Sequence, residues 1–304
     1  MTKEERAAMI IISVDLDEWY HCRCATGSSD SIWCDTQTFF KEYYGTDKPI
    51  GELVKPTEII LKMFDEYGIK ATFFVLGEVA GFYPDLVKEI SRRGHEIACH
   101  GLRHVDLYSL SKAQFVDELK QAKDILESLI QKQVIGYRAP NLITELWVLD
   151  VLENLGFEYD SSVCPSRPLM GKFRNVMQAP QNPYRPSTYS LTTPGNHKIV
   201  EIPIPTFPVL KIPAATGNMT RVIGRWWTTM ALKHALKTGM AAYYFHPFEL
   251  APRPNITRSS PYRWLFFRHA GEWMKKTLDV LFREFNGKFI SCQEAARRFA
   301  THES

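Results

Sequence analysis

Short apolar runs with the pattern of β-strands alternate with amphipathic helical segments along most of the chain. The expected strands cover residues 10–14, 70–76, 96–99, 134–137, 157–159, 198–204 and 240–245. The expected helices start near residues 56, 84, 111, 145 and 225, and a last one covers about 271–285. Repeated strand-then-helix units are typical of parallel strands joined by crossover helices. The sequence therefore predicts an α/β fold, either a barrel or a doubly wound sheet.

Composition limits the class of protein further. The chain has 304 residues, of which 45% are hydrophobic, and a formal net charge of +3. This apolar content is sufficient for a large core and excludes an intrinsically disordered chain. The near balance of charge predicts no nucleic-acid partner. No Gly- or Ser-rich linker divides the chain, so we expect residues 1–304 to form a single domain.

The lengths of the apolar segments and the number of cysteines indicate the cellular compartment. No segment reaches the roughly 18–20 apolar residues that a membrane-spanning helix needs. The apolar run at residues 7–12 is too short for an export signal, so we expect a cytoplasmic protein whose six cysteines are reduced thiols. A second metal cluster with His21 is the alternative for Cys22, Cys24 and Cys34, but their Cys-x-Cys spacing fits structural zinc poorly and favours free thiols.

Asp15 and Asp17 follow directly after the first expected strand, in VDLDEWYH. The carboxyl ends of parallel strands carry the functional loops of α/β folds. Two carboxylates two residues apart on an extended segment point the same way, which suits a metal ligand beside a general base. For such a pair considered by itself, a solvated acidic loop is the commoner explanation.

His100 and His104 follow the expected strand at 96–99, in CHGLRH. A His-x3-His spacing can place two imidazoles on one cation. Gly101 between them favours a tight loop or a helix start over a helix interior. Taken alone, this spacing does not establish a metal site.

Arg138, Asp160 and His246 follow three further expected strands. Each alone has an ordinary explanation: an exposed arginine, an aspartate in a turn, a histidine before a proline. Together with the aspartate and histidine pairs, they place a polar residue at the end of five separate strands. In a parallel barrel those ends meet on one rim, where active sites lie, so the joint pattern predicts an active site there.

Five motifs occur in a fixed order: VDLD at 14–17, HGLRH at 100–104, RAPN at 138–141, YDSS at 159–162 and YFHPFEL at 244–250. In this order they resemble the motifs of polysaccharide deacetylases with NodB homology, also called carbohydrate esterase family 4. Residues 216–227 and 267–281 resemble, less specifically, a subgroup found in bacterial and archaeal exopolysaccharide gene sets. The resemblance implies a distorted (β/α)7 barrel, with a NodB-like core at about 10–250 and a C-terminal helical extension at about 251–304.

The resemblance also implies a divalent metal held by Asp17, His100 and His104. Two imidazoles and one carboxylate with open positions suit zinc first, with cobalt, nickel or manganese as alternatives. Asp15 would be the general base that activates water.

The remaining motif residues would complete the acid–base chemistry of a family member. Arg138 would orient the base, His246 would protonate the leaving amine, and Asp160 would tune His246. The backbone N–H of Asn141 would help to stabilise the oxyanion. Amide hydrolysis needs an activated water, a stabilised tetrahedral oxyanion and a proton for the leaving nitrogen, and this set supplies all three.

Three positions depart from the family pattern. Leu16 separates Asp15 from Asp17, where the common form has adjacent aspartates; a minority branch resembling peptidoglycan deacetylases and cyclic-amide hydrolases shares the spaced form. Gly101 stands where serine or threonine is usual, and Asn141 stands where an aromatic residue often follows the proline. These changes keep the ligands and leave the substrate open.

We therefore expect a de-N-acetylase that acts on an N-acetylhexosamine-containing saccharide, and a lipid or nucleotide carrier fits a cytoplasmic enzyme best. One alternative is a hydrolase of a small non-sugar amide, such as a cyclic imide or ureide. Another is a non-catalytic carbohydrate-binding barrel, which would lack a base or a ligand, and none is missing. Basic and aromatic residues mix at 221–227 and 262–276, which suits either peripheral membrane contact or ordinary packing.

Overall fold

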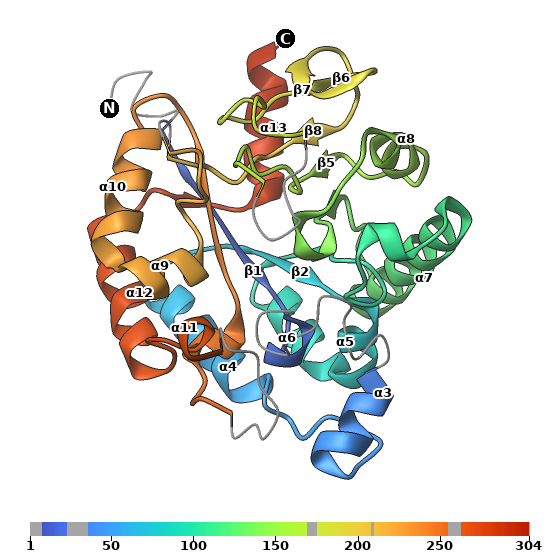
Figure 1. The fold of residues 1–304 in the computed structure, drawn as a ribbon, viewed down its shortest axis with the longest axis vertical. Helices are drawn as coiled ribbons and strands as arrows, with labels where there is room; N and C mark the ends of the chain where they lie inside the picture. Colours follow the sequence, from blue (N-terminus) through green and yellow to red (C-terminus); the bar gives the residue numbers. More distant parts are fainter. Residues whose placement is uncertain (1–7, 23–35, 169–174, 208–209, 255–262, 304) are drawn as a thin grey trace.

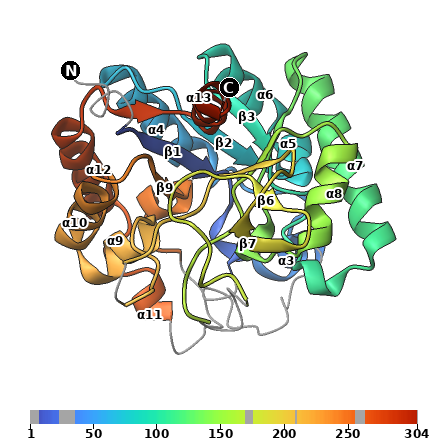
Figure 2. The same cartoon turned by 90° about the horizontal axis from the view of Figure 1, so that it is seen from above.

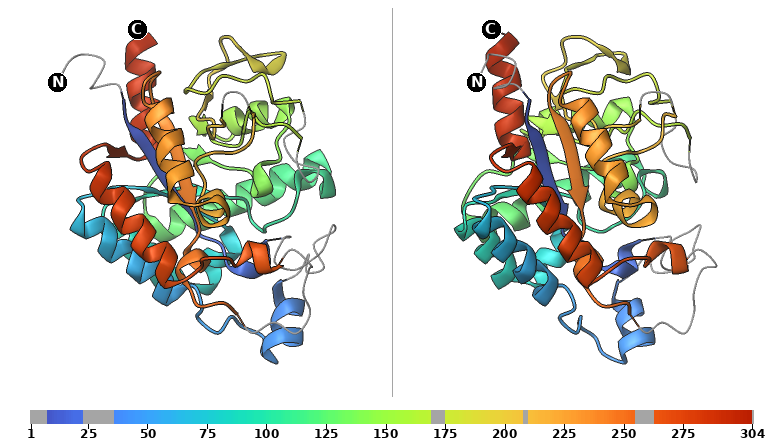
Figure 3. Two further views of the ribbon diagram at one scale, coloured as in Figure 1. Left: turned by 60° about the vertical axis from the view of Figure 1, so that its left-hand side comes forward. Right: turned by 90° about the vertical axis from the view of Figure 1, so that its left-hand side faces the viewer.

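A curved sheet of eight parallel strands forms the centre of the molecule in the computed structural model, which describes residues 8–22, 36–168, 175–207, 210–254 and 263–303 (Figure 1). The strands are β1 (Ile10–Asp15), β2 (Thr72–Val75), β3 (Glu96–Cys99), β4 (Gly136–Tyr137), β5 (Tyr159–Asp160), β8 (Val200–Glu201), β9 (Ala241–Phe245) and β10 (Phe289–Ile290). Their order is β10-β1-β2-β3-β4-β5-β8, and β9 also pairs with β1. Figure 3 shows β1 and β9 side by side.

Without the short β10, seven strands remain, running from β9 through β1 to β8. Among the described residues, β8 and β9 do not pair, so the barrel is open between them. This arrangement confirms the predicted distorted (β/α)7 barrel.

Helices cover the outside of the sheet, with α7 and α8 on one side and α10 and α12 on the opposite side (Figure 1, Figure 2). The α-helices are α3 (Thr36–Phe39), α4 (Val54–Glu66), α5 (Gly77–Phe82), α6 (Pro84–Arg92), α7 (Lys112–Ile130), α8 (Leu146–Asn154), α9 (Gly217–Ile223), α10 (Arg225–Ala235), α11 (Arg263–Phe266), α12 (Glu272–Glu284) and α13 (Cys292–Glu303). Short helical turns are η1 (Trp19–His21), η2 (Phe40–Tyr44), η3 (Leu107–Ser109), η4 (Pro140–Leu142) and η5 (Pro247–Leu250). A small antiparallel pair, β6 (Pro186–Ser187) and β7 (Ser190–Pro194), lies apart from the main sheet. No helix in the described ranges is long and apolar enough to cross a bilayer.

The strands face the helices with one set of side chains and the barrel interior with the other. On β1, Val14 packs in the core beneath the helices, whereas Ile11 joins a separate cluster with Phe74 of β2. Because successive side chains of a strand point to opposite faces, Asp15 lies on the same side as Ile11. The last residue of β1 is therefore directed into the barrel at its carboxyl end.

The start of helix α4 and the structure of the C-terminal segment differ from the sequence-based expectation. Helix α4 begins at Val54 rather than at Pro56. Proline is tolerated there because the first turn of a helix has no intrahelical partner for its N–H groups. The C-terminal segment expected to be helical also contributes β10, whose Ile290 is in register with Ile11 of β1. That segment is built into the main sheet.

Candidate active site

Asp17, His100 and His104 come together at the carboxyl ends of β1 and β3. One possible ligand atom of each lies within 4.8 Å of the others. Asp17 Oδ2 is 3.7 Å from His100 Nε2 and 3.3 Å from His104 Nε2. Both carboxylate oxygens of Asp17 are buried, and neither has a hydrogen-bond partner among the described residues. A buried carboxylate without such partners is costly unless a cation compensates it, so these residues fit a divalent metal.

The orientation of His100 supports the same conclusion. Its Nδ1 lies 2.7 Å from the backbone carbonyl oxygen of Arg138. Because a carbonyl only accepts hydrogen bonds, Nδ1 carries the proton. The Nε2 lone pair is then directed towards Asp17, as in metal-binding histidines whose other nitrogen bonds a carbonyl.

Burial and charge determine the protonation of the three groups. Burial raises the pKa of Asp17, but His104 and His100 lower it more, and the pKa lies well below its usual range. Burial dominates at His104 and lowers its pKa, which favours the neutral form that binds metals. At His100, burial lowers the pKa and Asp17 raises it, with a net upward direction, so a proton competes with a cation for this ligand.

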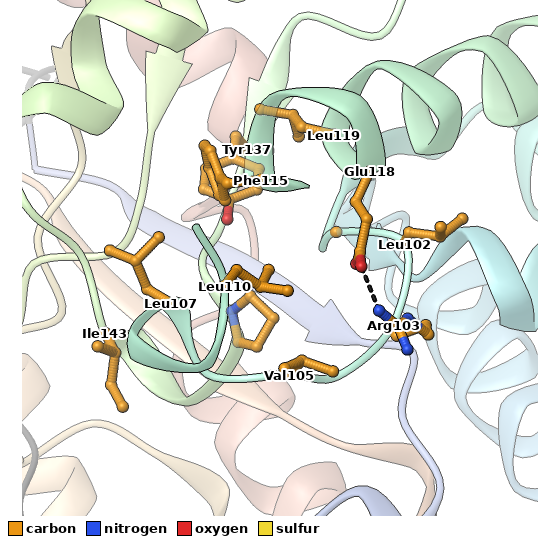
Figure 4. Close-up of a pocket in the computed structure, with 12 residues that line it drawn as sticks. Leu102, Arg103, Val105, Leu107, Leu110, Phe115, Glu118, Leu119, Tyr137 and Ile143 are labelled. Atoms are coloured by element: carbon orange, nitrogen blue, oxygen red, sulfur yellow. Dashed lines mark hydrogen bonds and ion pairs between the residues drawn. The ribbon is translucent and has the colours of Figure 1, made fainter. Parts of the chain in front are cut away.

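The loop that carries both histidines is anchored on its two sides. Gly101 has a φ of 94°, in the region that favours glycine, and its carbonyl oxygen accepts a 2.9 Å hydrogen bond from Gly77 N of α5. Arg103 forms an ion pair with Glu118 of α7. Figure 4 shows the apolar side chains behind the loop, which leave a cavity of only about 20 Å³. The two candidate metal-binding histidines therefore lie on a closely packed support.

Arg138 fixes one oxygen of Asp15. Its Nη1 donates to Asp15 Oδ1 at 2.6 Å and to Ser13 Oγ at 3.0 Å, and its Nη2 donates to Ser161 Oγ at 2.8 Å. The guanidinium is fully buried, with its carbon 4.0 Å from the centre of the Phe74 ring. The second oxygen of Asp15, Oδ2, is left to face the site.

His246 lies opposite this second oxygen, with its Nε2 3.9 Å from Asp15 Oδ2. Its Nδ1 is 2.8 Å from Oε1 of Glu249. Asp160, which the resemblance assigns to tuning His246, accepts a hydrogen bond from Ser162 Oγ. The tuning role that the resemblance implies for Asp160 stays a prediction, and Glu249 occupies the Nδ1 side of the His246 ring. Sequence reasoning missed Glu249, although its His-x-x-Glu spacing at the start of a short helix is a recognisable capping pattern.

Asp160 and Glu201 of β8 form a pair of buried carboxylates. Burial raises the pKa of Asp160 to about 6 and raises that of Glu201 well above its usual range. Two buried carboxylates side by side cannot both ionise cheaply, so the pair retains a proton to higher pH than an ordinary carboxyl group.

Asn141 lies in the turn η4, with its φ at 57°. Asparagine tolerates this left-handed conformation better than most residues. Its side-chain Nδ2 donates to Asp106 Oδ1 at 2.8 Å. This hydrogen bond fixes the turn beside the loop that carries His100 and His104. The role of its backbone N–H at an oxyanion stays a prediction.

The cysteines and the basic-aromatic segments lie partly inside and partly outside the described residues. Cys24 and Cys34 lie outside the described residues, and His21 Nε2 is 3.4 Å from Glu78 Oε1. Burial raises the pKa of the Cys99 thiol to about 12, which makes it a poor nucleophile. The basic-aromatic segments are divided between packing and exposure, as their aromatic side chains show. Trp227, Phe266 and Phe267 are buried, whereas Trp226 is 60% and Trp264 61% exposed.

Fold and site together define an α/β barrel with a His-His-Asp ligand set and an Asp–His pair at one edge. A protein of Mycobacterium smegmatis assigned as a polysaccharide deacetylase has a similar structure, with a TM-score of 0.64 at 18% identity, covering 97% of this chain and 90% of the other. An allantoinase matches with a TM-score of 0.60 at 16% identity, covering 97% and 91%. At these identities the likeness shows the fold alone.

Sequence comparisons show which families parts of the chain resemble. Residues 47–159 match the model described as polysaccharide deacetylase, and residues 161–296 match one described as a domain of unknown function, DUF3473. The first match covers a little over a third of the chain, and the second covers less than half of it. The first match includes both histidines of the ligand set and begins after Asp17.

Two curated relatives show how far the sequence similarity extends. A peptidoglycan deacetylase-like protein of Gibberella zeae is 37% identical over 106 residues, which are 34% of this chain and 31% of that protein. The peptidoglycan deacetylase of Helicobacter pylori is 31% identical over 134 residues, which are 40% of this chain and 43% of that protein. The chain thus spans less than half the length of these relatives.

Proposed function

We propose that the chain is a metal-dependent hydrolase that removes the N-acetyl group from an N-acetylhexosamine-containing saccharide. The observation that carries the proposal is the Asp17, His100 and His104 set, within 4.8 Å, at the same edge as the Asp15–His246 pair. Relatives named as peptidoglycan, chitin and chitooligosaccharide deacetylases support an N-acetylated sugar as the substrate class.

Zinc is the proposed metal, because two imidazoles and one carboxylate with open positions suit it; cobalt, nickel and manganese can take the same ligands. Such an ion supplies Lewis acidity that polarises the acetyl carbonyl and acidifies water. Asp17, His100 and His104 would hold it.

The chain's own residues would then move two protons. Asp15 Oδ2 accepts the proton of the attacking water, while Arg138 holds Oδ1 at 2.6 Å and so fixes the carboxylate plane. His246 Nε2 donates a proton to the leaving nitrogen as the C–N bond breaks. The backbone N–H of Asn141 donates to the oxyanion. Acid–base groups of this kind contribute about 10²- to 10⁴-fold to the rate.

An acetate-release assay tests the proposal. The panel compares N-acetylglucosamine saccharides, free and lipid- or nucleotide-linked, with cyclic imides and ureides. We expect acetate from the saccharides, and we expect Asp15→Asn to lose at least about 10³-fold while its metal content is unchanged. Substantial residual activity in that variant would refute the base assignment. Turnover of imides alone would favour the small-amide alternative, and no turnover with metal bound would favour a binding barrel.

We also propose that the chain acts as one structural unit, because β10 near its C-terminal end pairs with β1. The proposed cytoplasmic location is supported by the free thiols of Cys99, Cys164 and Cys292. Peripheral membrane contact is proposed through α10, where the exposed Trp226 stands beside Arg225.

A further inference from the structure

We propose that Glu249, held in place by Arg221, is the positioning residue for the general acid His246. This is the part that the family resemblance assigned to Asp160. The inference rests on the proposed function, because it concerns the proton that His246 delivers to the leaving nitrogen.

Glu249 holds His246 at two points with one carboxylate oxygen. Its Oε1 accepts a 3.1 Å hydrogen bond from the backbone N–H of His246 and lies 2.8 Å from the ring Nδ1. Because an ionised carboxylate only accepts hydrogen bonds, Nδ1 carries a proton. Nε2 is then the ring atom that faces Asp15, so Glu249 sets both the tautomer and the direction of the ring.

Arg221 of α9 keeps the Glu249 carboxylate ionised. Its Nε donates to Glu249 Oε2 at 2.7 Å, and both side chains are almost fully buried. Burial raises the pKa of Glu249, but Arg221 and His246 lower it more, and the net direction is downward. Arg221 also donates through Nη1 to the carbonyl oxygens of Phe266 and Arg268. The guanidinium is therefore held both by the Glu249 carboxylate and by two backbone carbonyl oxygens, which fix its position.

Gly217 closes the space around the same carboxylate. A Cβ atom at this position would lie 2.4 Å from Glu249 Oε2 and 2.5 Å from Oε1. Helix α9 thus approaches the carboxylate as closely as only glycine allows. Gly217, Arg221 and Glu249 all fall within residues 161–296, the part that matches the domain of unknown function. This part of the chain therefore contributes directly to the geometry of the active site.

The test compares substrates that differ in their need for an acid. Amide hydrolysis requires a proton on the leaving nitrogen, whereas 4-nitrophenyl acetate releases a phenolate that requires none. Glu249→Gln should lower kcat for the N-acetylated saccharide by about 10²-fold with little change in KM, and should change ester hydrolysis by less than about 3-fold. A purely structural role would lower both rates alike, and that result would overturn the inference.

A matched control is Glu96→Gln. Glu96 is a half-buried carboxylate at the start of β3, at the opposite end of the barrel, and it accepts hydrogen bonds from Tyr159 Oη at 2.7 Å and from Gln293 N at 2.9 Å. Its substitution should leave the ratio of amide to ester rates unchanged. A fall in that ratio equal to the fall in Glu249→Gln would also overturn the inference.

A second measurement needs no substrate. Proton–nitrogen correlation spectra of the His246 ring, assigned with a His246→Gln variant, should show a protonated, strongly hydrogen-bonded Nδ1 that is lost in Glu249→Gln. An unchanged Nδ1 signal would contradict the contact. If the wild-type protein releases acetate from no saccharide, the proposed function fails, while this spectrum still decides whether Glu249 sets the state of His246.

Discussion

Replacing Arg138 with methionine should destabilise the protein mainly by leaving the charge of Asp15 uncompensated. The guanidinium is fully buried and makes four hydrogen bonds: one to Asp15 at 2.6 Å, one to Ser13 at 3.0 Å and two to Ser161 at 2.8 and 3.1 Å. The methionine side chain keeps the apolar contact with the Phe74 ring, so the change isolates the charge and its hydrogen bonds.

The magnitude follows from the burial of the partner. Asp15 is only 3% exposed, and removing one partner of a buried ion pair costs about 3–5 kcal/mol because the other charge stays buried. Asp15→Asn combined with Arg138→Met removes both charges. The double variant should therefore lose less stability than the sum of the two single variants, with a coupling of about 1–3 kcal/mol.

Urea unfolding of the wild type, both single variants and the double variant measures this coupling. All samples contain a chelator, so that no bound cation contributes to stability. Arg283→Met removes an exposed ion pair with Asp279 on α12 and should leave the unfolding midpoint unchanged. A loss below about 1 kcal/mol in Arg138→Met, or strict additivity in the double variant, would refute the reasoning.

Three further predictions concern stability. Ser111→Ala should cost about 1 kcal/mol in urea unfolding, because Ser111 Oγ caps α7 at Gln114 N; an unchanged midpoint would contradict this. Gly136→Ala should lower the free energy of unfolding by about 1–3 kcal/mol, because its Cβ would meet the Tyr159 ring at 2.0 Å, whereas Gly81→Ala meets nothing within 4 Å and should not destabilise. Asp160, whose pKa is raised to about 6, keeps a proton that the unfolded chain releases above about pH 4. Wild-type stability should therefore fall between about pH 4 and 6, and Asp160→Asn should reduce that fall by up to about 3 kcal/mol; equal pH dependence of both proteins would refute it.

The edge that carries the site could be predicted from the sequence because strand ends are local features. Asp15, His100 and His246 each follow an apolar run that ends where its polar residue begins, and parallel strands bring such ends to one edge. The prediction of α7 rested on a helical period and a capping box, and both hydrogen bonds of that box are present.

Features that depend on tertiary contacts could not be predicted in this way. Arg221 meets Glu249 across 28 residues of chain, and the short α9 that carries it has no strong helical period. β8 is shorter than the expected strand at 198–204, because Pro203 and Pro205 have no N–H to donate to a sheet ladder. The resemblance implied that Asp160 tunes His246, whereas the contact between His246 Nδ1 and Glu249 Oε1 is visible only in the folded structure.

In the proposed active site, Asp17, His100 and His104 hold a divalent metal. Mass spectrometry of purified wild type and of a His100→Ala/His104→Ala variant measures it most directly, with His234→Ala on α10 as a histidine control outside the site. We predict about one divalent ion per chain in the wild type and in the control, and its loss in the double variant. Equal metal content in wild type and double variant, or none in either after reconstitution, would contradict the account.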